Sequence, residues 1–195
     1  MAALSEDPEL IALYGSGDMY DLFASTHLGL ENNRKAAKQL FLSYAYGMSR
    51  KALIDAAVSL GASRENAKSA FRQFARYEEW KKSIWETFKS EGRIATSEVN
   101  HYTRNEKGQL TGREQRSAVS QVVQGTASLF FKKALLEVSK IEDVTILLPM
   151  HDALLFEHEL PEMPPKVVAA FESIMTAQLE GRVKGKASIS SFAPA

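Results

Sequence analysis

The chain has 195 residues and a mass of 21.6 kDa, which is enough for one full-sized domain or two small ones with a buried core. Its 45% hydrophobic and 25% charged residues are ordinary globular values and exclude a collagen, a coiled-coil rod and a disordered tail. Because cysteine is absent, a disulfide framework and a thiolate metal site are excluded as well. No apolar run has the length of a membrane span and the amino terminus lacks a signal-peptide pattern, so we expect a cytoplasmic protein with no membrane partner.

The charges balance overall but separate along the sequence. Twenty-four lysines and arginines stand against 24 acidic residues, which gives a net charge of zero. Between residues 31 and 52 five bases accompany Glu31 alone, whereas between residues 137 and 180 nine acids accompany two lysines. The basic stretch can attract an anion and the acidic stretch a cation. Solvated surface faces are the commoner origin of such runs, so charge alone leaves both explanations open.

The first two thirds of the chain predict helices. One helix is expected over residues 33–46, a second over 49–60, and a pair over 62–92 that breaks near Tyr77. Asparagine and serine residues precede these segments and can cap them, and glycines follow them and can end them. The expected caps and stops are Asn32 or Asn33, Gly47, Gly61, Ser63 and Gly92.

Large apolar side chains recur at helical spacing between residues 71 and 88. We interpret them as core packing rather than as a platform on which bases stack. The following stretch, 92–113, is polar and irregular and predicts a loop. The apolar residues concerned are Phe71, Phe74, Trp80, Ile84, Trp85 and Phe88.

The final third mixes helices and strands. A helix over 115–140 precedes two strand-like runs, 144–150 and 153–160, and only His151 and Asp152 separate these runs. A hairpin with these two residues at its tip is the natural interpretation. A last helix over 166–180 and one more strand over 186–192 complete an α+β fold, with helical and antiparallel-sheet parts.

Four side chains in the first predicted helix repeat every four residues. Arg34, Lys38, Leu42 and Tyr46 drift by only ~40° per step and form one slanting stripe. The two cations lie in the amino-terminal half, where the helix dipole adds positive potential, so together they could clamp a di- or triphosphate. Tyr46 would lie about 18 Å farther along the axis, the reach from a phosphate tail to a base. A basic surface helix with a buried tyrosine explains the spacing equally well.

Asp152 at the predicted hairpin tip presents the opposite charge. A carboxylate held rigidly between two apolar strands suits Mg²⁺, which prefers oxygen ligands and is commonly held by one or two carboxylates with substrate phosphate. Two-metal phosphoryl transfer normally needs more than one such carboxylate. A simple tight turn is the alternative explanation for the His-Asp pair.

Three motifs in order resemble those of family A DNA polymerases, the DNA polymerase I type. RKAAKQLFLSYAYGMS at 34–49 is similar to the fingers-helix motif, RSAVSQVVQGTASLFF at 116–131 to the Gln-Gly-Thr-Ala helix, and LPMHDALLFE at 148–157 to the His-Asp palm motif. The opening residues 1–24 resemble the stretch just after the family's first catalytic motif. The resemblance therefore covers nearly the whole chain.

The resemblance implies a role for each matching residue. Arg34 and Lys38 would contact the triphosphate of an incoming dNTP, and Leu42 stands where the family usually has a Phe or Tyr that contributes to sugar discrimination. Tyr46 and Gly47 would pack beside the templating base. The remaining roles concern the primer-template DNA and the metal: Arg116 and Gln124 would lie along the template and primer, His151 would contact the primer end, and Asp152 would be a catalytic ligand of Mg²⁺, of which two ions are expected.

The resemblance also implies a division of the chain. Residues 1–14 would be a leading palm segment, 15–112 the helical fingers and 113–195 the carboxy-terminal palm. The family's other catalytic aspartate and the thumb are absent from these 195 residues. We therefore expect a split or truncated polymerase of a bacterial or phage-infected cell, which a complementing amino-terminal chain would complete.

The predicted function is DNA-directed DNA polymerase, a nucleotidyl transfer from dNTP to a primer 3′ end in replication or repair. The alternative is a non-catalytic nucleic-acid-binding remnant of such an enzyme. A third possibility is an unrelated helical interaction domain, in which Arg34 and Lys38 would have no part in binding nucleotides or DNA.

Overall fold

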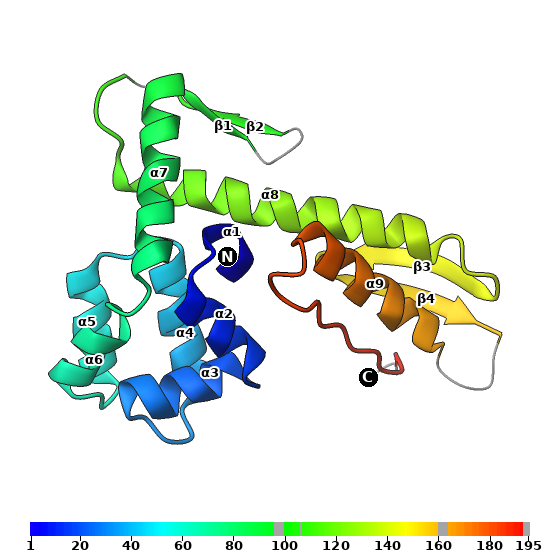
Figure 1. The fold of residues 1–195 in the computed structure, drawn as a ribbon, viewed down its shortest axis with the longest axis horizontal. Coiled ribbons are helices and arrows are strands. Elements are labelled where there is room, and N and C mark those ends of the chain that lie inside the picture. The colour runs from blue at the N-terminus through cyan, green and yellow to red at the C-terminus, as the bar shows by residue number, and fades with distance from the viewer. Residues whose placement is uncertain (96–99, 106, 160–163, 193–195) are drawn as a thin grey trace. The chain divides into compact units, whose positions relative to one another are not determined.

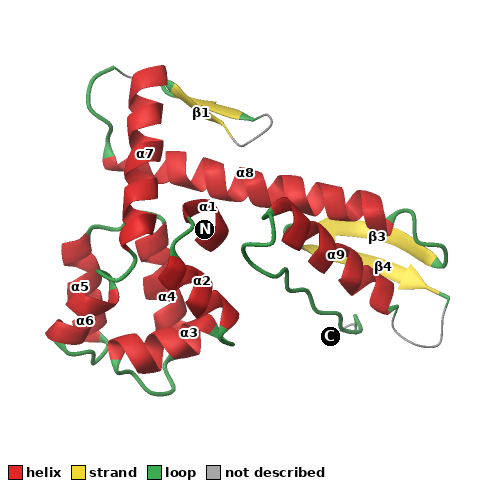
Figure 2. Cartoon of the chain, in the orientation of Figure 1, coloured by secondary structure: helices red, strands yellow, loops and turns green. Residues whose placement is uncertain are grey.

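The computed structural model describes residues 1–95, 100–105, 107–159 and 164–192 (Figure 1). Helices dominate it, and the strands form two small antiparallel hairpins (Figure 2), which confirms the α+β class. The chain divides into two compact units, residues 1–123 and 124–195. No helix among the described residues is long and apolar enough to cross a membrane.

The amino-terminal part of the first unit consists of short helical segments. Asp7 and Asp18 each precede one of them, and their carboxylates accept hydrogen bonds from backbone N–H groups of the first turn, at 3.0 Å to Leu10 and 3.0 Å to Tyr20. These caps explain where the segments begin. The segments are α1 (Ala2–Ser5), α2 (Pro8–Gly15), α3 (Met19–Leu22) and the π-helical η1 (Phe23–Leu28).

The four helices predicted between residues 33 and 92 are present. Ser63 caps the third, as expected, and Ser49 caps the second. The break between the last two falls at residues 71–74 and not near Tyr77, because the Tyr77 backbone N–H donates to the buried Asp7 carboxylate in the first turn of the last helix. The helices are α4 (Arg34–Ala45), α5 (Arg50–Ser59), α6 (Arg64–Ala70) and α7 (Ala75–Glu91).

Aromatic rings form the centre of this unit's core. The Phe23 ring lies 5.4 Å from Phe41 and 5.7 Å from Phe71, and Tyr44 lies 5.3 Å from Phe71, between ring centroids. These four side chains are 5% exposed or less. Of the predicted core residues, Phe71, Phe74, Ile84 and Phe88 are buried and Trp80 and Trp85 are half-buried, so the core interpretation is confirmed.

The loop predicted over 92–113 is wrong in part. Two short strands, β1 (Arg93–Ala95) and β2 (His101–Thr103), pair antiparallel, with Ile94 opposite Tyr102. Their apolar side chains pack on α7, where the Tyr102 ring stacks on Phe88 at 5.2 Å. The packing of Ile94 and Tyr102 on α7 therefore stabilises two strands in a stretch whose composition is mostly polar.

A capping box begins the long helix α8 (Gly112–Val138). The Thr111 hydroxyl accepts a hydrogen bond from the Glu114 N–H at 3.2 Å, and the Glu114 carboxylate accepts one from the Thr111 N–H at 2.8 Å. The Glu114 carboxylate also pairs with Arg104 at 3.0 Å, and Trp85 donates to the Gln115 carbonyl at 3.0 Å. These contacts fasten the start of α8 to the preceding segment and to α7.

In the second unit, β3 (Val144–Met150) pairs antiparallel with β4 (Ala153–His158). Met150 lies opposite Ala153, so His151 and Asp152 form a two-residue turn, and His151 adopts a φ of 48°. The helix α9 (Pro165–Gln178) follows. The second predicted strand, 153–160, is present as far as His158, and its last predicted residue lies outside the described residues.

The strand predicted over 186–192 is not present. In the described part of this unit that segment has no ladder partner. Side chains of α9 accept backbone N–H groups at its start instead, from Gly185, the residue just before the segment, to Thr176 Oγ1 at 2.8 Å and from Ala187 to Glu172 Oε1 at 3.3 Å. An alternating pattern gives a strand only where another strand offers hydrogen bonds.

Candidate functional site

Both cations of the predicted stripe lie beside one aromatic ring. The Arg34 guanidinium carbon is 5.5 Å from the centroid of the Tyr20 ring, and Lys38 Nζ is 5.7 Å from it. Both side chains are exposed, and Tyr20 is half-buried between α3 and α4. Attraction between a cation and the ring face holds the two charges near each other. The result is a compact cationic site on the first half of α4.

An acidic side chain shares this site. Arg34 donates to Asp18 Oδ2 from Nε at 2.8 Å and from Nη2 at 2.7 Å, and Asp21 lies 4.0 Å from Nε. The hydrogen bond from Arg34 lowers the pKa of the Asp18 carboxyl below its usual range, and the same bond raises the pKa of the guanidinium. Arg34 is therefore held in place by a carboxylate that an incoming anion would have to displace.

The second half of the stripe lies at the carboxyl end of α4. Leu42 and Tyr46 are half-buried, and Gly47 follows with a φ of 91°, a conformation that favours glycine. A Cβ at Gly47 would lie 3.4 Å from Arg116 Cγ, so α8 approaches this turn closely. The structure thus brings together Tyr46, Gly47 and Arg116, which the sequence separates by about seventy positions.

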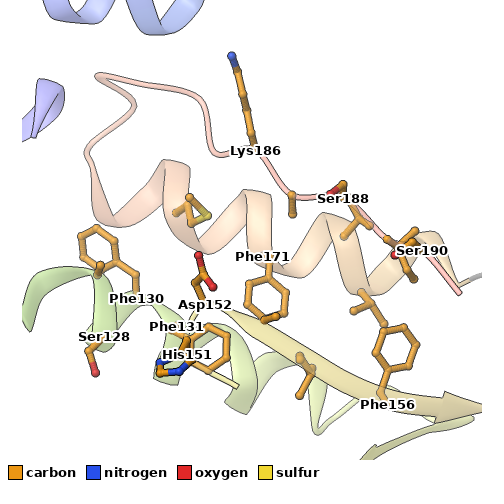
Figure 3. Close-up of a pocket in the computed structure, with 18 of the residues that line it drawn as sticks. Ser128, Phe130, Phe131, His151, Asp152, Phe156, Phe171, Lys186, Ser188 and Ser190 are labelled. Carbon is orange, nitrogen blue, oxygen red and sulfur yellow. The ribbon is translucent and has the colours of Figure 1, made fainter. Parts of the chain in front are cut away.

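The second unit holds the remaining predicted residues around a pocket of about 920 Å³. Gln124, His151 and Asp152 line it, together with Phe131 and Phe171. Figure 3 shows the Asp152 carboxylate and the His151 imidazole pointing in opposite directions from the turn. Both residues are exposed, so the turn presents a carboxylate and an imidazole to solvent above an apolar floor.

Asp152 supplies one carboxylate to this site. Among the described residues no group of three or more acidic or histidine side chains gathers where it could hold a metal ion. A two-ion centre needs several oxygen ligands, so the described residues alone do not fit one. Asp152 fits the narrower role of a single oxygen ligand.

Two residues of the cationic site were missed from the sequence, Asp18 and Tyr20. Their spacing gives a partial signal, because an aspartate two residues before an aromatic residue can cap a helix and place the ring in its first turn. That the ring then lies beside two cations of another helix follows from the packing of α3 against α4, which no local pattern predicts.

The model of DNA polymerase family A matches residues 1–191, and the chain belongs to that family. The predicted resemblance is confirmed.

Three relatives illustrate the similarity. DNA polymerase theta of Caenorhabditis elegans is 32% identical over 181 residues, 89% of this chain and 11% of the relative, and DNA polymerase I of Helicobacter pylori is 27% identical over 84% of this chain and 20% of the relative. The solved POL domain of Pol1 from M. smegmatis, in complex with DNA primer-template and dNTP, superposes with a TM-score of 0.73 at 25% identity. That match covers 95% of this chain and 35% of the solved one, so the chain spans about a third or less of each relative.

Proposed function

We propose that this chain is the fingers and carboxy-terminal palm of a DNA-directed DNA polymerase, which transfers a nucleotide from dNTP to a primer 3′ end in replication or repair. The observation that carries the proposal is the convergence of Arg34 and Lys38 on Tyr20, in a chain that a polymerase family model matches from end to end. The solved relative in complex with primer-template and dNTP supports both partners. The proposed subdivision remains 1–14, 15–112 and 113–195.

Arg34 and Lys38 would bind the triphosphate. Their two charges can follow phosphate oxygens while Tyr20 keeps the side chains extended along its face. In the reaction the primer 3′-hydroxyl oxygen attacks the α-phosphorus and pyrophosphate leaves. Negative charge grows on the phosphate oxygens during that step, so fixed cations beside them lower the barrier.

The end of α4 would face the pairing bases. Tyr46 and Gly47 would pack beside the templating base, with Leu42 below the nucleotide sugar and Arg116 along the template strand. The left-handed Gly47, tight against Arg116, supports this arrangement, because close backbone approach to a flat base needs a residue without a side chain.

The hairpin turn would meet the primer end. His151 would contact the primer terminus, Gln124 would lie along the duplex, and Asp152 would be a ligand of Mg²⁺, whose bound form assists phosphoryl transfer by neutralising charge. The exposed carboxylate at the rim of the pocket supports this role. A second carboxylate would come from polypeptide outside this sequence, in the same protein or in a complementing chain.

The hairpin itself supports a complementing polypeptide. Among the described residues β3 and β4 pair only with each other, and a two-stranded sheet is marginally stable by itself. Leu147, Leu148 and Met150 on β3 are 51%, 49% and 38% exposed. Further palm strands would cover these side chains and complete the sheet. A bacterial or phage-infected cell would supply the cytoplasmic setting.

Primer extension tests the proposal. The chain is assayed with Mg²⁺ alone and after mixing with a polypeptide that carries the family's first catalytic aspartate motif and thumb. We expect extension only in the mixture, and its loss in Asp152→Asn. Asp143→Asn is the matched control, because Asp143 is an exposed aspartate beside β3 whose φ of 66° suits asparagine.

Two outcomes contradict parts of the proposal. Efficient copying by the chain alone would remove the need for a complementing polypeptide. Salt-sensitive primer-template binding that survives Asp152→Asn, with no extension in any mixture, would identify a non-catalytic nucleic-acid-binding remnant.

A further inference from the structure

A charged lysine is buried at the carboxyl end of α4, away from the cationic site. The Lys81 side chain, on α7, is 4% exposed. Its ammonium pairs with Glu78 at 2.8 Å and lies 4.5 Å from the centroid of the Tyr44 ring and 5.0 Å from that of Tyr77. Burial lowers the pKa of Lys81, and Glu78 opposes that change.

Two donors from α7 reach the last carbonyl groups of α4. Tyr77 Oη donates to the Ala45 carbonyl at 2.6 Å, and Lys81 Nζ lies 3.5 Å from the Tyr44 carbonyl. The last carbonyls of a helix lack partners within the helix, and their partial negative charge favours a cation. Lys81 and Tyr77 thus stabilise the turn that directly precedes Tyr46.

The first turn of α7 is itself anchored. The Tyr77 N–H donates to Asp7 Oδ2 at 3.0 Å, and the Tyr77 ring stacks on Trp80 at 5.5 Å. The Asp7 carboxylate, 1% exposed, also caps α2. Because α7 is fixed to α2 in this way, its two donors hold the end of α4 at a defined place in the first unit.

A buried ammonium costs free energy that an apolar side chain of the same length would not. The position could be filled by methionine, which would pack against both rings. What methionine cannot supply is a charge beside the helix carbonyls. This difference separates a positioning role from simple core packing.

We propose that Lys81 is a positioning residue that, through the end of α4, sets the place of Tyr46 and Gly47. The effect on template binding rests on the proposed function, since Tyr46 and Gly47 are assigned to the templating base. The effect of Lys81 on the conformation of the turn after α4, the structural half of the proposal, is measurable in the free chain without substrate. Nucleotide selectivity would then depend on a residue that touches neither nucleotide nor DNA.

Amide hydrogen exchange of the 195-residue chain tests the structural half. Gly47 and Met48 donate to the Tyr44 and Ser43 carbonyls at 3.0 and 2.9 Å, so their amides report the turn directly. We expect Lys81→Met to speed exchange at these two amides about tenfold, the effect of losing a hydrogen bond to a charged group. The exposed Lys82→Met is the control, and Lys81→Arg should restore slow exchange.

Binding of two probes tests the functional half. Inorganic tripolyphosphate would engage Arg34 and Lys38 alone, whereas primer-template with an unpaired template base would also engage Tyr46. We expect Lys81→Met to weaken primer-template binding about tenfold and to leave tripolyphosphate binding unchanged. A general loss of stability would weaken both.

The outcomes separate the inference from the function it builds on. Unchanged exchange at Gly47 and Met48 in Lys81→Met overturns the inference, whether or not the chain binds DNA. Should Lys81→Met not fold, Lys81→Gln removes the charge and keeps a polar side chain, and unchanged exchange there overturns the inference equally. Failure of the unsubstituted chain to bind either probe contradicts the proposed function, and equal weakening of both probes overturns positioning.

Discussion

Arg34 presents the same guanidinium edge to Asp18 that a phosphate would need. The pair is exposed, at 50% and 39%, so it contributes little to stability and exchanges readily with a competing anion. The carboxylate orients the guanidinium in the free protein and also lowers its affinity for anions. The Arg34–Asp18 contact therefore favours preorganisation of the guanidinium at the expense of its affinity for anions.

Asp18→Asn should therefore raise affinity for tripolyphosphate only modestly, by about two- to fivefold, because a solvent-exposed ion pair is weak. Isothermal titration at neutral pH measures it. Asp55→Asn is the control, since Asp55 pairs with Arg64 at 3.1 Å on another surface. The Asp18 pKa is lowered, so the pair persists below the usual carboxyl range and is lost only as pH falls through that lower value. A decrease in affinity would show that Asp18 mainly orients Arg34.

Gly47→Ala should weaken primer-template binding more than it weakens tripolyphosphate binding. A non-glycine residue at a φ of 91° costs about 1–2 kcal/mol, and the added Cβ would contact Arg116 Cγ at 3.4 Å. Titration with both probes and a urea unfolding curve measure the change. Gly108→Ala, at a φ of 94° with no atom within 4 Å of the added Cβ, is the matched control for backbone strain alone. Equal effects of the two substitutions on binding would contradict a role for the contact with Arg116.

At the scale of elements, the first unit depends on a cross-connection between α2 and α7. The buried Asp7 carboxylate accepts one hydrogen bond from Leu10 on α2 and one from Tyr77 on α7, 70 positions after Asp7. Asp7→Ala removes a helix cap and leaves the Tyr77 N–H buried without a partner, so we expect a loss of about 2–4 kcal/mol in the free energy of unfolding. Ser63→Ala, an exposed cap of α6, should cost about 1 kcal/mol. Urea unfolding compares the two, and equal losses would contradict the cross-connection.

Element prediction succeeded where the signal is local. The Ser63 cap gave the start of α6, and the glycine stops gave the ends of α5 and α7 to within a residue or two, because these signals act on the adjacent turn. It failed for β1, β2 and the segment 186–192. A strand depends on partners that lie elsewhere in the chain or outside it, so composition alone does not decide it.

At the scale of the whole molecule, the two units differ in their cores. Aromatic residues from η1, α4, α7 and the turn between α6 and α7 fill the first, whereas the buried apolar side chains described in the second are small: Ala134, Val138 and Val167. We expect the second unit to exchange its amide hydrogens at lower urea than the first, because it buries less apolar surface. Mixing with a complementing palm polypeptide should raise the urea concentration at which the amide hydrogens of the second unit exchange. Identical urea dependence of both units would contradict this difference.

The sequence by itself determined the family, the α+β class and the positions of the main helices, because the order and spacing of motifs and the caps of helices are present in the linear order of residues. It also put Arg34 and Lys38 on one stripe and His151 and Asp152 together. Only the tertiary structure decided that Tyr20 lies beside both cations, that Asp18 holds Arg34, that Gly47 meets Arg116 and that Lys81 is buried against the end of α4. Those contacts join residues far apart in the chain, and packing free energy, which depends on every neighbour at once, selects them.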